Sequence, residues 1–205
     1  RMVDKCAARI HELLAKREPS EDLASKFDIY STGLSIIFLV DLDQTEYRDD
    51  IQCLLTHLGK AQKEHGGWGY PQLSTGDTSM TQYGVLASWT ASNAGFDIPL
   101  KSIERATQWL IRTQDPDGGY GYQGKLGENG VLIKQSDVKP SLTAAGMGSL
   151  YFCCDLLDLN QKVEPGEEAP PSALKEIKPK EKKDKAKRKT SIDPRTVRNT
   201  QERGN

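Results

Sequence analysis

The chain has 205 residues, of which 36% are hydrophobic and 28% charged, and this length suffices for one domain with its own core. Its formal net charge is −1, but residues 175–205 hold 12 of the 28 basic residues and only 5 of the 29 acidic ones, so an acidic body precedes a basic tail. The longest apolar run, near residues 34–42, is far shorter than the roughly 20 residues that cross a bilayer, and we expect no membrane span.

Helical spacing of apolar residues appears first in residues 3–16 and again in residues 47–63, which predicts two amphipathic helices. Between them, residues 30–42 are apolar on nearly all sides and predict a buried helix, with Asp28 as its N-cap. A period-two strand competes for residues 30–42, because Ile and Val favour strands. The alternation of helices along the rest of the chain favours the helix.

The same two kinds of segment recur further along. Residues 78–94 predict a second buried helix, with Asp77 at the N-cap position and Gly95 as its stop. Pro99 opens a third amphipathic helix. After a long loop, Pro140 begins a third buried helix that ends near residue 157.

An alternation of this kind predicts two layers, in which apolar helices line the inside and amphipathic helices face solvent. A bundle of equivalent helices does not alternate in this way. We therefore expect an all-α fold with three pairs of inner and outer helices.

Beyond residue 159 the periodicity stops. Residues 160–190 are rich in Pro, Glu and Lys and predict a disordered charged linker, whereas residues 191–205 have weak helical character and are typical of the start of a further helix. The lysine-rich run at 180–189 carries no interleaved aromatic residues, so we expect a solvated linker and no nucleic-acid binding.

The two ends and the cysteines bear on the compartment. No signal peptide is visible, and the sequence opens at Arg1 inside an expected helix, so we expect a segment cut from a longer protein. The four cysteines fit no zinc pattern and are expected as buried thiols of a reducing compartment: Cys6, Cys53, Cys153 and Cys154. This favours the cytoplasm, but localisation stays open because we expect a truncated start.

An internal repeat links the amphipathic helices to glycine-rich corners. Gly66-Gly67-Trp68-Gly69-Tyr70 and Gly118-Gly119-Tyr120-Gly121-Tyr122 follow Leu58 and Gln62 in one copy and Leu110 and Gln114 in the other, with a constant offset of 52 residues. A fixed period of this size indicates repeated supersecondary units.

These residues resemble the QW-type repeats of the terpene cyclase and protein prenyltransferase superfamily, which implies a partial α/α toroid over about residues 25–159. The matching pattern is Trp109-Leu110, Gln114 and Asp117-Gly118-Gly119-Tyr120, preceded by Leu58, Gln62 and Gly66-Gly67-Trp68. Three runs are similar to uncharacterised bacterial, planctomycete-like prenyltransferase and squalene oxidase repeat proteins: residues 75–84, 120–124 and 141–146. The resemblance also implies that each Gln bonds a neighbouring helix end and that the glycines adopt positive φ.

The chemistry of the family is not visible in this sequence. A cyclase of the family needs a D-x-D-D or D-C-T-A-E acid motif, and neither is present. The most similar segment is Asp41-Leu42-Asp43, which lies at an expected helix end. The prenyltransferases bind zinc through Asp, Cys and His, but the three histidines here are expected at the surface: His11, His57 and His65. We therefore expect no metal and no cofactor, and the only catalytic candidate is a weak one, Asp77.

In a toroid the starts of the inner helices converge on one mouth, which their dipoles make mildly electropositive. The ligand-binding candidates at this mouth are Asp77, Thr78, Thr81, Gln82 and Tyr83, with Trp68, Tyr70, Tyr120 and Tyr122 from the loops. Asp77 is most simply an N-cap, and the aromatics are most simply packing between repeats.

Three functions remain open from the sequence. The first is a toroid protein whose cavity binds an apolar or peptide ligand. The second is an isoprenoid cyclase or prenyltransferase-like enzyme, with an isoprenoid-like ligand and catalytic residues outside this segment. The third is a scaffold for protein partners. With three helix pairs, closure of a ring needs a protein partner or the remaining half of the toroid.

Overall fold

The structure, a computed structural model, describes residues 2–16 and 23–159, and residues 160–205, on which the linker and further-helix predictions fall, lie outside it. The described part is mostly helical, which confirms the predicted all-α class. Its helices are α1 (Met2–Ala15), α2 (Ile29–Asp43), α3 (Arg48–Ala61), α4 (Thr78–Asn93), α5 (Leu100–Arg112) and α6 (Pro140–Leu156). Short 3-10 turns cover Leu23–Ser25 and Glu128–Gly130, and two short strands are β1 (Gly76–Asp77) and β2 (Gln123–Gly124).

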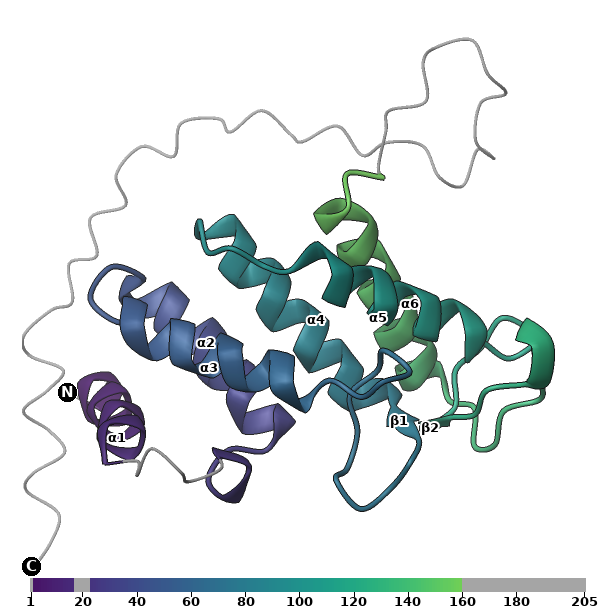
Figure 1. The fold of residues 1–205 in the computed structure, drawn as a ribbon, viewed down its shortest axis with the longest axis horizontal. Coiled ribbons are helices and arrows are strands. Elements are labelled where there is room, and N and C mark those ends of the chain that lie inside the picture. The colour runs from purple at the N-terminus through teal and green to yellow at the C-terminus, as the bar shows by residue number, and fades with distance from the viewer. Residues whose placement is uncertain (1, 17–22, 160–205) are drawn as a thin grey trace, which may run out of the picture. The chain divides into compact units, whose positions relative to one another are not determined.

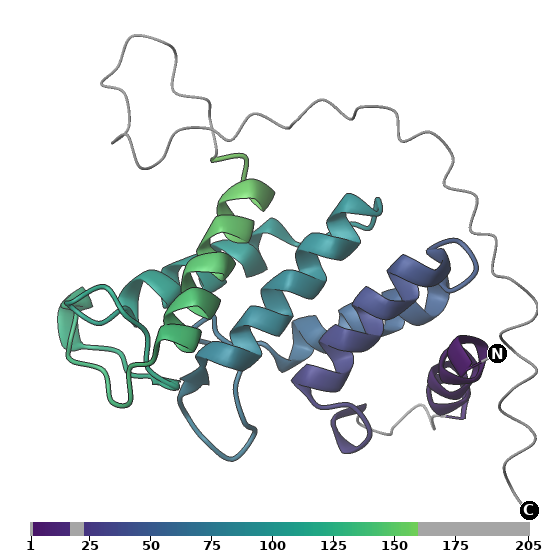
Figure 2. The ribbon, with the colours of Figure 1, turned by 180° about the vertical axis from the view of Figure 1, so that it is seen from behind.

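The helices α2, α4 and α6 lie side by side with α4 in the middle (Figure 2). On their other side, α3 contacts α2 and α5 contacts α4 and α6 (Figure 1). Because residues 29–43 form the helix α2, the strand that was the alternative for residues 30–42 is excluded. The predicted two layers are present for α2, α4 and α6 inside and α3 and α5 outside, whereas α1, expected as the outer helix of the first pair, contacts α3.

The three inner helices run in the same direction. Near their starts, the ring of Tyr30 in α2 lies edge-on to that of Tyr83 in α4, with centroids 5.2 Å apart. Near their ends, Trp89 Nε1 in α4 donates to Asp155 Oδ2 in α6 at 2.7 Å. The starts of the inner helices therefore meet at one end of the layer.

The inner helices are not buried on all sides, and the prediction of full burial for residues 30–42 is wrong for one face. In α2, Ile36 is fully buried while Leu34, two residues away and so on the opposite side of the helix, is 52% exposed. In α6, Ser149 is fully buried while Met147 and Tyr151 are 51% and 63% exposed. The outer helices cover one side of the layer only, and the uncovered side of α2, α4 and α6 is called the inner face below (Figure 2).

The outer helices meet through the repeat glutamine. Gln62 Nε2 donates to Gly66 O at 2.7 Å and to Ser102 O, near the start of α5, at 2.9 Å. Ser102 Oγ donates in turn to Gln62 Oε1 at 2.8 Å. In the second copy of the repeat, Gln114 Nε2 donates to Gly118 O at 3.0 Å, which corresponds to the bond from Gln62 to Gly66 O. The expected link from Gln62 to the next helix end is confirmed.

The long loop before α6 is organised by Asp115, which sequence reasoning did not single out. This carboxylate accepts from Asp117 N at 3.0 Å, Gln135 N at 2.8 Å and Lys134 Nζ at 3.1 Å. The bonds from the Asp117 and Gln135 amides, followed by that from Lys134, hold its pKa below the usual range. One buried side chain therefore fixes both ends of the loop.

Two side-chain expectations are corrected. His57 is buried, with Nε2 3.0 Å from Phe27 O, because α3 turns this side chain toward the 3-10 turn before α2. Of the four cysteines expected to be buried, Cys153 is buried, Cys53 and Cys154 are partly exposed, and Cys6 is exposed. Within residues 2–16 and 23–159, no helix has the length and hydropathy of a bilayer span.

Candidate functional site at the starts of the inner helices

The first glycine corner ties an aromatic residue to the start of α4. Trp68 N donates to Thr81 Oγ1 at 3.0 Å, and Asp77 N donates to Trp68 O at 2.7 Å. The indole Nε1 of Trp68 donates to Leu58 O at 2.9 Å, and a Cβ on Gly84 would stand 2.8 Å from the ring. Trp68 is 1% exposed, so it is a packing residue between α3 and α4.

The second corner repeats this geometry at the start of α6. Tyr120 N donates to Thr143 Oγ1 at 3.2 Å, Lys139 N donates to Tyr120 O at 3.3 Å, and a Cβ on Gly146 would stand 2.5 Å from the Tyr120 ring. Tyr120 is fully buried, and burial raises its pKa to about 12. Gly66 and Gly118 have φ of 104° and 90°, which confirms the expected positive φ at both corners.

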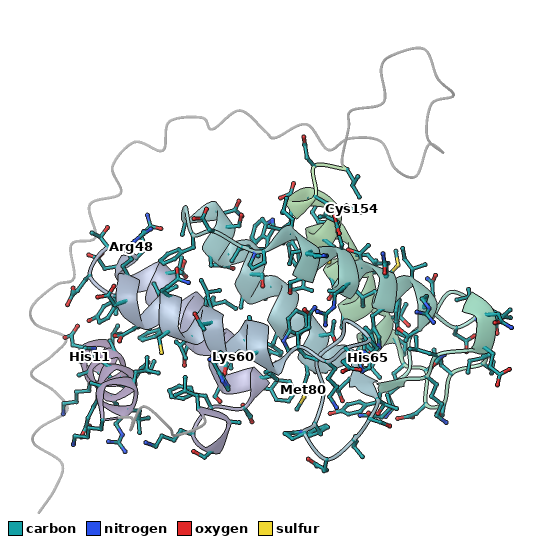
Figure 3. The ribbon with its side chains drawn as sticks, viewed as in Figure 1. His11, Arg48, Lys60, His65, Met80 and Cys154 are labelled. Carbon is teal, nitrogen blue, oxygen red and sulfur yellow. The ribbon has the colours of Figure 1, made fainter. Side chains whose placement is uncertain are left out.

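Trp109 joins the two corners. Its ring is 1% exposed and stacks on His65, with centroids 5.8 Å apart. His65 lies where the first corner leaves α3 (Figure 3). Three glycines approach the indole so closely that a Cβ would come within 2.7 Å: Gly67, Gly76 and Gly124. No side chain other than hydrogen fits at these positions without displacing the indole.

Beside Trp109, β1 and β2 pair in antiparallel fashion, with Asp77 opposite Gln123. Asp77 Oδ1 accepts from Met80 N at 2.9 Å, which makes Asp77 the N-cap of α4, and its Oδ2 accepts from Gln123 Nε2 at 2.9 Å. The carboxylate is fully buried, and this burial raises its pKa despite the hydrogen bonds. Asp77 therefore holds the two corners together through Gln123.

Three tyrosines cluster near this carboxylate, whose charge helps to raise the pKa of each of them, and Tyr122 O accepts from Thr78 N at 3.0 Å. Tyr30 comes from α2, Tyr70 from the first corner and Tyr122 from the second, and the three side chains lie close enough to influence one another's pKa. Tyr122 is 36% exposed and the other two are partly exposed. Burial is the main cause that raises the pKa of Tyr30, so its hydroxyl stays protonated and able to donate.

The remaining predicted site residues divide between packing and surface. Thr78 is fully buried, with Oγ1 donating to Gly121 O at 2.7 Å, and Thr81 is fully buried against Trp68. Gln82 and Tyr83 are partly exposed on α4. Of the predicted set, the structure leaves Tyr70 and Tyr122 at least partly exposed near Asp77, and it buries Asp77 itself together with Trp68, Tyr120, Thr78 and Thr81.

Sequence reasoning missed Tyr30, Ser79 and Gln123. Tyr30 follows the N-cap Asp28 by two residues, as Ser79 follows Asp77, so aligning the N-caps of the inner helices would have found both. Gln123 has no local signal, because it reaches Asp77 across 46 residues. Among the described residues, no group of three or more His, Cys, Asp or Glu side chains could hold a metal ion.

Comparison with known proteins gives a partial similarity. Over 66 residues, which are 32% of this chain and 12% of the relative, the chain is 38% identical to drimenyl diphosphate synthase of Streptomyces showdoensis. The chain thus spans 12% of the length of that relative. No family model and no solved structure matches the chain significantly. Part of the sequence is thus similar to part of a terpene synthase.

Proposed function

We propose that this chain belongs to an α/α toroid of the terpene-cyclase type and that its inner face binds an isoprenoid chain. The observation that carries the proposal is that apolar side chains are exposed on both α2 and α6, among them Leu34, Met147 and Tyr151. Exposed apolar surface of this kind commonly marks a site of binding. The partial similarity to a terpene synthase supports an isoprenoid as the occupant.

The tyrosine cluster of Tyr30, Tyr70 and Tyr122 is the polar end of the proposed site. It lies at the starts of α2 and α4, where hydroxyl donors and the positive ends of helix dipoles would favour the oxygen atoms of a ligand. Asp77 has both oxygens engaged, to Met80 N and Gln123 Nε2, so its proposed role is to hold the tyrosines in place from behind. Catalysis by the whole protein would need residues beyond those described.

The test is equilibrium binding of the 205-residue chain to polyprenyl diphosphates of increasing length and to squalene. We expect one of these ligands to bind saturably and Met147→Lys and Leu34→Lys each to weaken binding at least about tenfold, because a charge would be buried against the isoprenoid chain. Both positions are half exposed, so folding should change by no more than about 0.5 kcal/mol.

Ile111→Lys is the matched control, since Ile111 is 53% exposed but lies near the end of the outer helix α5. It should leave binding unchanged. Absence of binding to every isoprenoid offered, or equal weakening by Ile111→Lys, would overturn the proposal. Binding of an apolar peptide instead would make a peptide the ligand of the inner face.

A further inference from the structure

A groove of about 510 Å³ lies between α3 and α5, on the side of the molecule opposite the inner face. Its walls come from the two outer helices and from the linker that precedes α5, and α4 lies behind it (Figure 1). The size falls within the range of roughly 300–1,000 Å³ that is usual for small-molecule sites. The proposed function makes no use of this groove.

The depth of the groove is mostly apolar, and the one buried hydroxyl that lines it, that of Ser88, donates to Gly84 O at 2.8 Å. Leu58 and the indole of Trp68 are 2% and 1% exposed and line it from below, and Leu55 and Ile98 line it as partly buried side chains. An apolar chain in the groove would therefore meet aliphatic and aromatic carbon rather than water. The polar atoms of Gln62 and Ser102, which also line it, are bonded to each other.

The rim of the groove is basic although the body of the chain is acidic. Lys60, Lys101 and Arg105 line it against a single acidic residue, Asp97. Lys60 lies near the end of α3 (Figure 3). Within residues 2–16 and 23–159, none of these three cations forms an ion pair.

Two further features add positive potential. Arg105 Nη2 donates to Lys63 O at 2.5 Å, and Arg105 Nε is buried without a hydrogen-bond partner in the described part of the chain. The start of α5 also lies at the groove, and its N-cap, Pro99, offers no side-chain hydrogen bond to the helix amides. Ser102 N already donates to Pro99 O at 2.8 Å, so the first two amides of α5 and the helix dipole are what favour an anion at this position.

We propose that this groove binds a single-chain anionic amphiphile, whose phosphate or carboxylate lies among Lys60, Lys101 and Arg105 and whose apolar chain lies over Leu58 and Trp68. The site is separate from the inner face. It takes its specificity from the combination of an anionic head with an apolar chain, and neither part alone satisfies both the rim and the floor.

Gly59 offers a way to close the groove without harming the fold. It lies in α3 and lines the groove, and a Cβ built on it meets no atom within 4 Å. Gly148 in α6 has the same open surroundings but does not line the groove, so Gly59→Leu and Gly148→Leu are a matched pair. Both replace a helical glycine by a better helix former, so both variants should fold.

The experiment is calorimetric titration of the full chain with decyl phosphate below its micelle concentration, with decanol and inorganic phosphate as the two partial ligands. We expect one decyl phosphate to bind per chain, at least tenfold more tightly than decanol or phosphate. Gly59→Leu and Lys101→Glu should each weaken binding at least tenfold, and Gly148→Leu should leave it unchanged.

Other outcomes overturn the proposal. Equal binding of decanol would show that the cations play no part, and full binding by Gly59→Leu would place the ligand elsewhere, including on the inner face. Retention of the chain only by vesicles that contain an anionic lipid, with no binding of free decyl phosphate, would assign the basic rim to a membrane surface.

Discussion

Replacing Trp109 with alanine should lower the free energy of unfolding by about 3 to 5 kcal/mol, the usual cost of deleting a large buried aromatic side chain. The reason lies in its surroundings, since the ring is 1% exposed and three glycine backbones rest against it. Glycines have no side chains with which to fill the cavity, so the two corners would lose their common support. Chemical denaturation followed by circular dichroism measures the change.

Trp89→Ala is the control for this prediction. Trp89 is partly exposed between α4 and α6, where it contacts Phe152 and donates to Asp155, so we expect a loss of about 1 to 2 kcal/mol. An equal loss for the two tryptophans, or a loss at Trp109 below that at Trp89, would contradict the role given to Trp109.

The second large effect is expected at Asp77. Asp77→Ala removes the N-cap of α4 and leaves the buried Met80 amide and the Gln123 side-chain amide without an acceptor, and we expect a loss of about 2 to 4 kcal/mol. Because Asp77 also lies behind the tyrosine cluster, the variant should weaken isoprenoid binding as well. Denaturation and ligand titration on the same preparation measure the two effects.

Asp28→Ala separates capping from the other contacts. Asp28 caps α2 by accepting from Ser31 N and from Ser31 Oγ, each at 2.7 Å, but it is exposed, and within residues 2–16 and 23–159 no side chain from another element donates to it. Its loss should cost about 1 kcal/mol, the typical value for a helix cap. If Asp77→Ala cost no more than Asp28→Ala, the bond to Gln123 would contribute nothing.

The fold could be predicted because its signals are local. Periodicity gave the helices, and the caps Asp28 and Asp77 marked two of their starts. The exposed side of α2 and α6 could not be predicted, because Leu34 and Met147 are as apolar as their buried neighbours. Whether such a side chain is covered depends on what lies opposite, and one segment does not contain that information.

The site was predictable only in part. The repeat placed Trp68 and Tyr120 at equivalent corners, and the backbone amide of each donates to a threonine hydroxyl. That threonine lies 13 residues after Trp68 but 23 residues after Tyr120, because the second loop is longer. The constant offset of 52 residues between the two copies of the repeat therefore does not extend past the glycine corners to these threonines. The contacts of Trp109 and Gln123 join segments that are far apart in the chain, and no local pattern announces them.

Photoaffinity labelling of the chain with a benzophenone-bearing prenyl diphosphate, followed by peptide mapping, tests the central claim most directly. If the inner face holds the isoprenoid, label will appear in α2 and α6 near Leu34, Met147 and Tyr151, and unlabelled prenyl diphosphate will compete it away. Label confined to the groove between α3 and α5, or label that the competitor does not displace, would contradict it.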